Sequence, residues 1–136
     1  MERKLDISVI SPVFNELENL ETFVESVTAV MNSTNMSWEL IIVDDGSNDG
    51  SSKILKKIGH QENIRSILLS KNYGQTTAIQ AGFDNAVGKY FVTLDSDLQN
   101  DPKDIPMLIK KLINEELDLV VAVSYTHLRA HETVRN

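Results

Sequence analysis

Short apolar runs alternate with segments of helical periodicity along this chain. The runs are rich in β-branched residues and bounded by polar or turn residues, which is typical of strands covered on both faces. The segments between them repeat apolar residues every three or four positions, as amphipathic helices do. The predicted strands are 7–10, 40–43, 64–69, 90–94 and 117–123; the predicted helices are 17–31, a segment burying Ile54, Leu55 and Ile58, then 75–86, and Pro102 to Leu112.

Strands that alternate with helices through short connections form right-handed βαβ units on a mostly parallel sheet. We therefore predict an α/β fold. Asn15 is the predicted N-cap of the first helix, and the polar segment 47–50 offers caps for the second. Pro102 is suited to the first turn of the last helix, directly after Asp101.

Polar residues collect where four of the predicted strands end. Ligands of parallel sheets bind outside the carboxyl ends of the strands, so we expect these four segments to converge on one edge. The segments are 11–16, 44–47, 70–74 and 95–99.

The segment Asp95-Ser96-Asp97-Leu98-Gln99 is the strongest candidate for chemistry. Its two carboxylates and one amide oxygen are ligands that suit Mg²⁺ or Mn²⁺. Two carboxylates this close repel, and a bound cation or a raised pKa offsets the repulsion. The alternative is a solvated loop that leads into the helix capped by Asp101.

The other segments have structural alternatives as well. Asn15 and Glu16 can serve only to cap the first helix, and Phe14 can be a core residue. The sequence Asp44-Asp45-Gly46-Ser47 also suits a plain turn. Lys71 is either a surface lysine or a point charge for a substrate phosphate.

Composition narrows the class of protein. The chain has 136 residues, which is one domain's worth, and a formal net charge of -7, which argues against a nucleic-acid partner. It has no cysteine, so disulfides and thiolate zinc sites are excluded and a cytoplasmic location is favoured. No apolar run approaches the ~18 residues that a membrane span needs, and the amino terminus lacks signal-peptide features.

Four motifs in register resemble family 2 inverting glycosyltransferases with the GT-A fold, from Leu5 to about Val121. Within that family the chain is most similar to polyprenyl-phosphate sugar transferases of the dolichyl-phosphate mannose synthase and undecaprenyl-phosphate glucosyltransferase type. The resemblance implies the nucleotide-binding half of a GT-A type, Rossmann-like sheet flanked by helices. The motifs are Pro12-Val13-Phe14-Asn15-Glu16, Ile42-Val43-Asp44-Asp45-Gly46-Ser47, Lys71-Asn72-Tyr73-Gly74 with Ala81-Gly82, and 95–99.

The resemblance also implies roles for particular residues. A nucleotide-sugar donor of the UDP-glucose or GDP-mannose class would bind with Mg²⁺ or Mn²⁺, and Asp97 is the first candidate for a catalytic role. The cation stabilises the charge that develops on the departing nucleoside diphosphate. The implied base and ribose contacts are Pro12, Phe14, Glu16, Val43, Asp45 and Ser96, with Lys71 near a phosphate; the implied metal ligands are Asp95, Asp97 and Gln99.

Gln99 bears on the acceptor, because the D-x-D-L-Q form is typical of family members that use a lipid phosphate. A polyprenyl phosphate is already anionic and attacks with less need of a general base. One alternative is a glycosyltransferase with a saccharide or protein hydroxyl acceptor, and another is a folded stub without a ligand. A third, from another class, is a receiver-type phosphoacceptor domain, although its acidic pair would follow the first strand and not the second.

The last residues depart from the family pattern. Segment 124–136 resembles translated adapter sequence at the end of unrelated proteins, so we expect a donor-binding half-domain over 1–122 and a non-native tail over 123–136. A less favoured interpretation places His127 and His131 on one face of a helix, where they would bind a metal ion. We expect the fragment to be weakly active or inactive, and its longer parent to act at the cytoplasmic face of a membrane.

Overall fold

The computed structural model describes residues 5–96, 101–116, 119–122 and 131–134. The predicted order of strands and helices is confirmed, with β1 longer than predicted and one strand, β6, that was not predicted. The elements are β1 (Leu5–Val13), α1 (Leu17–Asn32), β2 (Trp38–Asp44), α2 (Ser51–Ile58), β3 (Ile64–Leu68), α3 (Gln75–Asn85), β4 (Gly88–Thr93), the 3₁₀ turn η1 (Pro102–Asp104), α4 (Ile105–Asn114), β5 (Leu119–Ala122) and β6 (His131–Val134).

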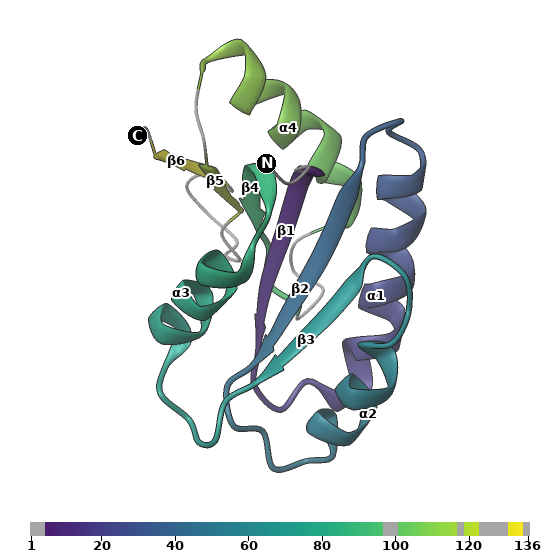
Figure 1. The fold of residues 1–136 in the computed structure, drawn as a ribbon, viewed down its shortest axis with the longest axis vertical. Helices are drawn as coiled ribbons and strands as arrows, with labels where there is room; N and C mark the ends of the chain where they lie inside the picture. The colour runs from purple at the N-terminus through teal and green to yellow at the C-terminus, as the bar shows by residue number, and fades with distance from the viewer. Residues whose placement is uncertain (1–4, 97–100, 117–118, 123–130, 135–136) are drawn as a thin grey trace.

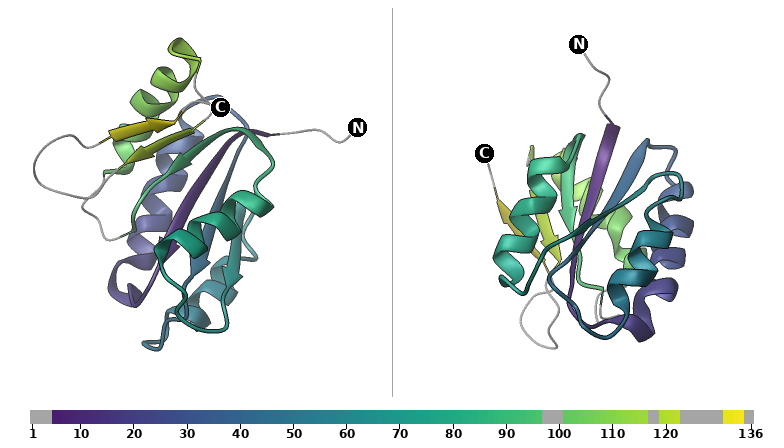
Figure 2. Two further views of the ribbon diagram at one scale, coloured as in Figure 1. Left: turned by 90° about the vertical axis from the view of Figure 1, so that its left-hand side faces the viewer. Right: turned by 60° about the horizontal axis from the view of Figure 1, so that its bottom comes forward.

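The strands form one sheet in the order β3-β2-β1-β4-β5-β6. Strands β1 to β5 pair in parallel, and β6 pairs antiparallel with β5. Helices α1, α2 and α4 lie on one face and α3 lies on the other (Figures 1 and 2). The chain runs from β1 outward to β3 and then crosses to β4 on the opposite side of β1, so the strand order reverses between β1 and β4.

The core has two parts, one on each face of the sheet. The larger part lies under α1, α2 and α4, and the smaller part joins Ile10, Ile41 and Val43 to Ala78 of α3. A Cβ atom on Gly82 would collide with the side chain of Ile10, so the lack of a side chain lets α3 approach β1 closely. All seven residues of β2 are buried, including the continuous apolar run 40–43 from which the strand was predicted.

Asn15 is not the N-cap of α1, so this prediction was wrong. Asn15 adopts a left-handed φ of 54°, and its Oδ1 accepts a hydrogen bond from Asn48 N at 2.9 Å. The first N–H of α1, that of Leu17, donates to Asp49 Oδ2 at 3.2 Å. The acceptor at the start of α1 therefore comes from the loop that precedes α2.

Asp49 also serves α2, because its Oδ1 accepts hydrogen bonds from Ser51 N at 3.0 Å and Ser51 Oγ at 2.6 Å. Desolvation raises the pKa of Asp49, but the hydrogen bonds from Ser51 and Leu17 outweigh it and hold this pKa below its ordinary value. One carboxylate thus binds the amino ends of two helices. The N-cap of α2 is Gly50, which lies in the predicted segment 47–50, while the side-chain acceptor comes from Asp49, one residue before the cap.

The last helical segment begins at Pro102, as predicted, with a 3₁₀ turn that leads into α4. Pro102 opens η1, and Asp101 Oδ1 accepts a hydrogen bond from Lys103 N at 2.9 Å. The apolar residues predicted to face the core are buried. They are Ile105, Leu108, Ile109 and Leu112.

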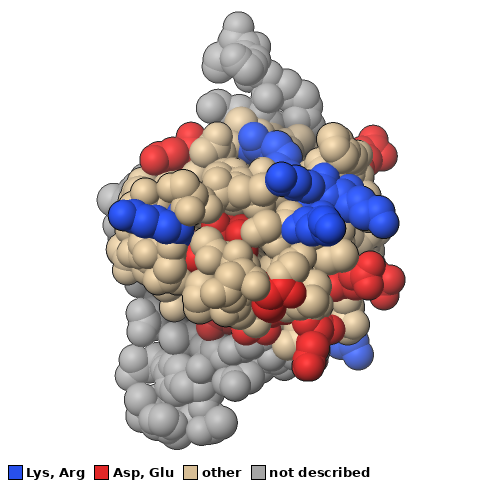
Figure 3. Space-filling view, turned by 90° about the horizontal axis from the view of Figure 1, so that it is seen from below, with Lys and Arg blue, Asp and Glu red and all other residues tan. Residues whose placement is uncertain are grey.

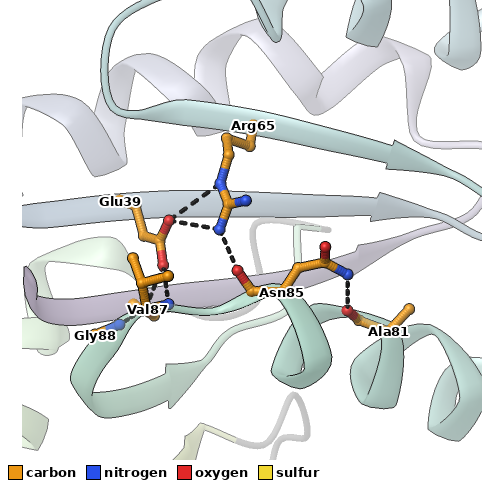
Figure 4. A network of polar contacts seen from close by, with 7 residues as sticks. Glu39, Arg65, Ala81, Asn85, Val87 and Gly88 are labelled. Carbon is orange, nitrogen blue, oxygen red and sulfur yellow. Dashed lines mark hydrogen bonds and ion pairs between the residues drawn. The ribbon is translucent and has the colours of Figure 1, made fainter. Parts of the chain in front are cut away.

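Glu39 lies near the start of β2 and is 4% exposed. It is therefore at the amino ends of the strands, and the polar loops are at the carboxyl ends. Its Oε2 accepts hydrogen bonds from Ser8 Oγ at 2.6 Å and Val87 N at 2.8 Å. Its Oε1 pairs with Arg65 Nη2 at 2.8 Å, and the same guanidinium also donates to Asn85 O (Figure 4). This Glu39 network links β1, β2, β3 and the segment before β4, and it was not predicted.

Candidate functional site

The loops after β1, β2 and β4 and the start of α3 enclose a pocket at the carboxyl ends of the strands. This pocket lies where the strand order reverses, the position at which open α/β sheets bind ligands. The face that carries the strand ends is hollowed at its centre, and acidic residues lie in the hollow (Figure 3). The pocket has a volume of about 190 Å³ and is lined by Pro12, Val13, Phe14, Glu16, Asp45, Gln75, Asp95 and Ser96.

Asp45 is held in place by the loop that follows β3. Its carboxylate accepts hydrogen bonds from Tyr73 N at 2.8 Å, Gly74 N at 2.9 Å and Asn72 Nδ2 at 3.2 Å. Asn72 Nδ2 also donates to Asp45 O at 3.1 Å. Asp45 is 4% exposed and still lines the pocket, so its orientation is fixed before any ligand arrives.

Gly46 allows these two loops to touch. It has a left-handed φ of 77°, and a Cβ atom there would collide with the backbone of Lys71 and Asn72, lying 2.8 Å from Lys71 Cα. Only glycine combines this φ with such a close approach at little cost. The short turn after β2 therefore needs glycine for steric as well as conformational reasons.

Asp44 and Asp45 have different surroundings. Asp44 Oδ2 accepts hydrogen bonds from Ser52 Oγ at 2.6 Å and Ser47 N at 3.3 Å, so Asp44 stabilises the turn and the start of α2. Asp45 lines the pocket. The turn interpretation of this segment thus applies to Asp44, while Asp45 stays a candidate for ligand contact.

The loop after β1 is joined to the turn after β2 by two hydrogen bonds. Asn15 N donates to Ser47 Oγ at 2.8 Å, and Asn48 N donates to Asn15 Oδ1 at 2.9 Å. These bonds place Phe14 and Glu16 on either side of Asn15. Both line the pocket, and the Phe14 side chain is 44% exposed, which leaves an aromatic face open to a planar ligand.

Asp95 and Ser96 bring the end of β4 to the same pocket. Asp95 is half-buried, and its Oδ1 accepts a hydrogen bond from Gln75 Nε2 at 3.3 Å; Ser96 is buried. The predicted ligands Asp97 and Gln99 lie outside the described residues. Among the residues that the structure describes, no three His, Cys, Asp or Glu side chains are grouped to hold a metal ion.

Two other predicted residues do not line the pocket. Val43 is fully buried in the core beneath α3, and its contact with a base stays a prediction. Lys71 is exposed, with Nζ 5.4 Å from the centre of the Tyr73 ring. Gln75 was missed, although its place at the start of a helix that follows one of the four polar segments was a usable signal.

A family model described as "Glycosyl transferase family 2" matches residues 8–132. The chain belongs to glycosyl transferase family 2. The resemblance drawn from the motifs is confirmed, and the family assignment decides against a receiver-type domain. The match extends past residue 122, and β6 lies within the predicted tail; His131 is in this strand and not on a helix, while His127 lies outside the described residues.

Curated relatives include polyprenyl-phosphate sugar transferases. The dodecaprenyl-phosphate galacturonate synthase of Rhizobium johnstonii is 46% identical over 121 residues, covering 88% of this chain and 36% of the relative. The undecaprenyl-phosphate 4-deoxy-4-formamido-L-arabinose transferase of Pectobacterium atrosepticum is 45% identical over 107 residues, covering 77% and 33%. The chain therefore spans about a third of the length of the curated relatives it matches.

Solved structures confirm the GT-A type fold. A mannosyltransferase from Pyrobaculum calidifontis, in complex with GDP-Man and Mn²⁺, matches with a TM-score of 0.65 at 20% identity, over 81% of this chain and 33% of its own. TarS of S. aureus in complex with UDP-GlcNAc matches with a TM-score of 0.62 at 21% identity, over 85% of this chain and 33% of its own. At this level of identity the likeness concerns the fold.

Proposed function

We propose that this chain carries the donor-binding half of a polyprenyl-phosphate sugar transferase. The observation that supports this most directly is the pocket at the reversal of strand order, which is lined by both Asp45 and Asp95 and by the exposed ring of Phe14. Relatives at 46% and 45% identity are transferases whose names specify dodecaprenyl or undecaprenyl phosphate. The chemistry of the pocket and the names of these relatives point to the same reaction class.

The nucleotide of a sugar donor fits the part of the pocket between Phe14 and Asp45. Phe14 would stack on the base, and Asp45 would accept a hydrogen bond from a base N–H. Three loop donors already hold the Asp45 carboxylate, so a ligand would lose little free energy in ordering it. Pro12, Glu16 and Ser96 would bound the ribose.

The residues at the end of β4 fit a divalent cation. Asp95 presents a half-buried carboxylate at the pocket wall, and oxygen ligands of this kind suit Mg²⁺ or Mn²⁺. Asp97 and Gln99 would complete the set, and Lys71 would supply a further positive charge for a phosphate. When bound, the cation would offset negative charge on the departing nucleoside diphosphate.

The acceptor in the longer parent would be a polyprenyl phosphate, and the parent would act at the cytoplasmic face of a membrane. Within the described part of the chain, none of the helices is both long and apolar enough to cross a bilayer. The second candidate, a saccharide or protein hydroxyl acceptor, is favoured by none of the contacts seen in the pocket.

Calorimetric titration tests the donor site. UDP-glucose and GDP-mannose are titrated into the protein with and without Mn²⁺, and into an Asp97→Ala variant. We expect one of the two nucleotide classes to bind in the presence of Mn²⁺ and binding to be lost in D97A. Asp84→Ala is the matched control, because Asp84 is an exposed acid of α3 that does not line the pocket.

Intact, folded protein that binds neither donor with Mn²⁺ would contradict the proposal. Equal loss of binding in D97A and D84A would also contradict it, because the effect would then reflect net charge and not the pocket.

A further inference from the structure

Gln75 is the first residue of α3, and its side chain joins this helix to the end of β4. Its Nε2 donates to Asp95 Oδ1 at 3.3 Å, and both residues line the pocket. The two residues are 20 positions apart in the chain, so the bond depends on the folded arrangement of the loops. Gln75 is exposed and could bond to water instead, so the bond matters chiefly for the orientation of Asp95.

Gly74 sets the direction in which α3, and with it Gln75, leaves the loop after β3. Its φ of 108° and ψ of 158° lie in a region that is essentially restricted to glycine. A Cβ atom on Gly74 would meet nothing within 4 Å, so the backbone conformation, and not crowding, requires glycine here. Strained backbone of this kind clusters at functional sites, and this residue directly precedes a pocket residue.

Segment 72–75 holds the two aspartates that line the pocket. Residues 72–74 donate three N–H groups to the carboxylate of Asp45, which follows β2. The next residue, Gln75, donates to Asp95, which follows β4. Four consecutive residues therefore orient side chains that come from two different strand ends.

We propose that Gln75 is a positioning residue, which holds the Asp95 carboxylate in the orientation needed to bind a divalent cation. This inference rests on the proposed function, in which Asp95 is a cation ligand. A residue that hydrogen-bonds to a metal ligand orients it, and loss of such a partner weakens metal binding by roughly 10- to 100-fold. Because segment 72–75 also holds Asp45, one short segment sets the two aspartates relative to each other before any ligand binds.

Titration with Mn²⁺ alone tests the role of Gln75. Mn²⁺ is added to nucleotide-free wild type and to Gln75→Met, and the free ion is followed by electron paramagnetic resonance. Methionine nearly keeps the length of the side chain and removes its N–H donors. We expect Q75M to bind Mn²⁺ roughly tenfold more weakly, with an unchanged midpoint of urea unfolding.

The matched control is Gln80→Met. Gln80 is an exposed glutamine of the same helix, and its Nε2 donates to Asp84 Oδ1 at 3.0 Å, but neither Gln80 nor Asp84 lines the pocket. We expect Q80M to bind Mn²⁺ as the wild type does. Equal weakening in Q75M and Q80M would overturn the proposal, and so would wild-type affinity for Mn²⁺ in Q75M.

Nucleotide binding without metal separates positioning of Asp95 from direct contact with the ligand. UDP and GDP are followed by ligand-observed NMR, which detects the weak binding expected without the cation. Q75M should bind them as the wild type does, and weaker binding would make Gln75 a nucleotide contact and overturn the proposal. Gly74→Ala should weaken both nucleotide and Mn²⁺ binding, because alanine does not hold this backbone conformation and both aspartates would lose donors. Unchanged binding of both in G74A would contradict the role of segment 72–75.

Calorimetry with the nucleotide-sugar donors separates this inference from the proposed function. Donor binding by wild type, together with equal Mn²⁺ affinities of wild type and Q75M, refutes the positioning role alone. A wild-type protein that binds neither donor with Mn²⁺ refutes the proposed function and this inference with it. Weaker Mn²⁺ binding in Q75M but not in Q80M, with donor binding by wild type, supports both.

Discussion

Gly46 is the residue whose substitution most directly tests how the pocket is built. Gly46→Ala adds one methyl group at a left-handed φ of 77°, where it collides with the backbone of Lys71 and Asn72. An alanine in this conformation costs about 1 kcal/mol. The collision must also displace the loop after β3, whose Tyr73 and Gly74 N–H groups donate to Asp45.

Each of these two charge-assisted hydrogen bonds contributes about 1.5 kcal/mol to the free energy of unfolding. Water that takes the place of a broken bond recovers part of this amount. We therefore expect G46A to lower the free energy of unfolding by about 3 kcal/mol in total. Gly50→Ala is the matched control. Gly50 has a φ of 100°, but a Cβ atom there would meet only the Leu17 side chain at 3.5 Å, so G50A should cost about 1 kcal/mol.

The assay is urea unfolding followed by the fluorescence of Trp38, the single tryptophan, which lies buried in β2. The difference in free energy of unfolding between G46A and G50A measures the cost of the collision, because the cost of placing alanine at a left-handed φ is common to both variants. If the two variants lost equal stability, the contact between the turn after β2 and the loop after β3 would contribute nothing, and the reasoning would be refuted.

Three other substitutions test contacts around the sheet. Glu39→Ala leaves Ser8 Oγ, Val87 N and a half-exposed Arg65 without their acceptor, and urea unfolding should show a loss of about 2 kcal/mol. Asp49→Ala removes an acceptor shared by two helix starts and should lower the free energy of unfolding by about 1 kcal/mol at neutral pH. Because the folded state lowers the pKa of Asp49, this contribution is present above the ordinary value of 3.8 and is lost as pH falls through the folded pKa. The free energies of unfolding of wild type and D49A should therefore converge in unfolding series carried into acid. Asn72→Ala should weaken donor binding in calorimetry more than it weakens the fold, since Asn72 is exposed and holds Asp45.

Each has a control or a contradicting result. Glu21→Ala removes an exposed acid of α1, and a cost equal to that of E39A would mean that the Glu39 network contributes no stability. A difference in free energy of unfolding between wild type and D49A that stays constant into acid would contradict the role assigned to Asp49 at the two helix starts. Unchanged donor affinity in N72A would show that Asp45 keeps its orientation without this amide.

The sequence predicted the parallel sheet because its signals are local. The run at 40–43 is apolar and β-branched, and β2 is buried on both faces as that pattern requires. The polar segments after the strands also predicted the pocket, since parallel strands end at one edge. Pro12, Phe14, Glu16, Asp45, Asp95 and Ser96 all line it.

The errors concern contacts between segments far apart in the chain. Asn15 has the composition of an N-cap, but the acceptor for α1 is Asp49, whose distance from Leu17 only the folded loops determine. Glu39 precedes the predicted strand and has no local feature that reveals its partners. The clamp on Asp45 was not predicted for the same reason, because its donors come from a loop 27 to 29 residues away.

The Glu39 network also has a consequence for the opposite edge of the sheet. It joins β1, β2 and β3 near their first residues, and a slip of one residue in any pairing would turn every side chain of the shifted strand to the opposite face. Pairing then runs in fixed steps from there to the strand ends, where Val13 faces Asp44 and Asp44 faces Leu68. The network therefore helps to fix the register of these three strands. The register in turn determines where each strand ends relative to its neighbours, and hence where the pocket loops begin.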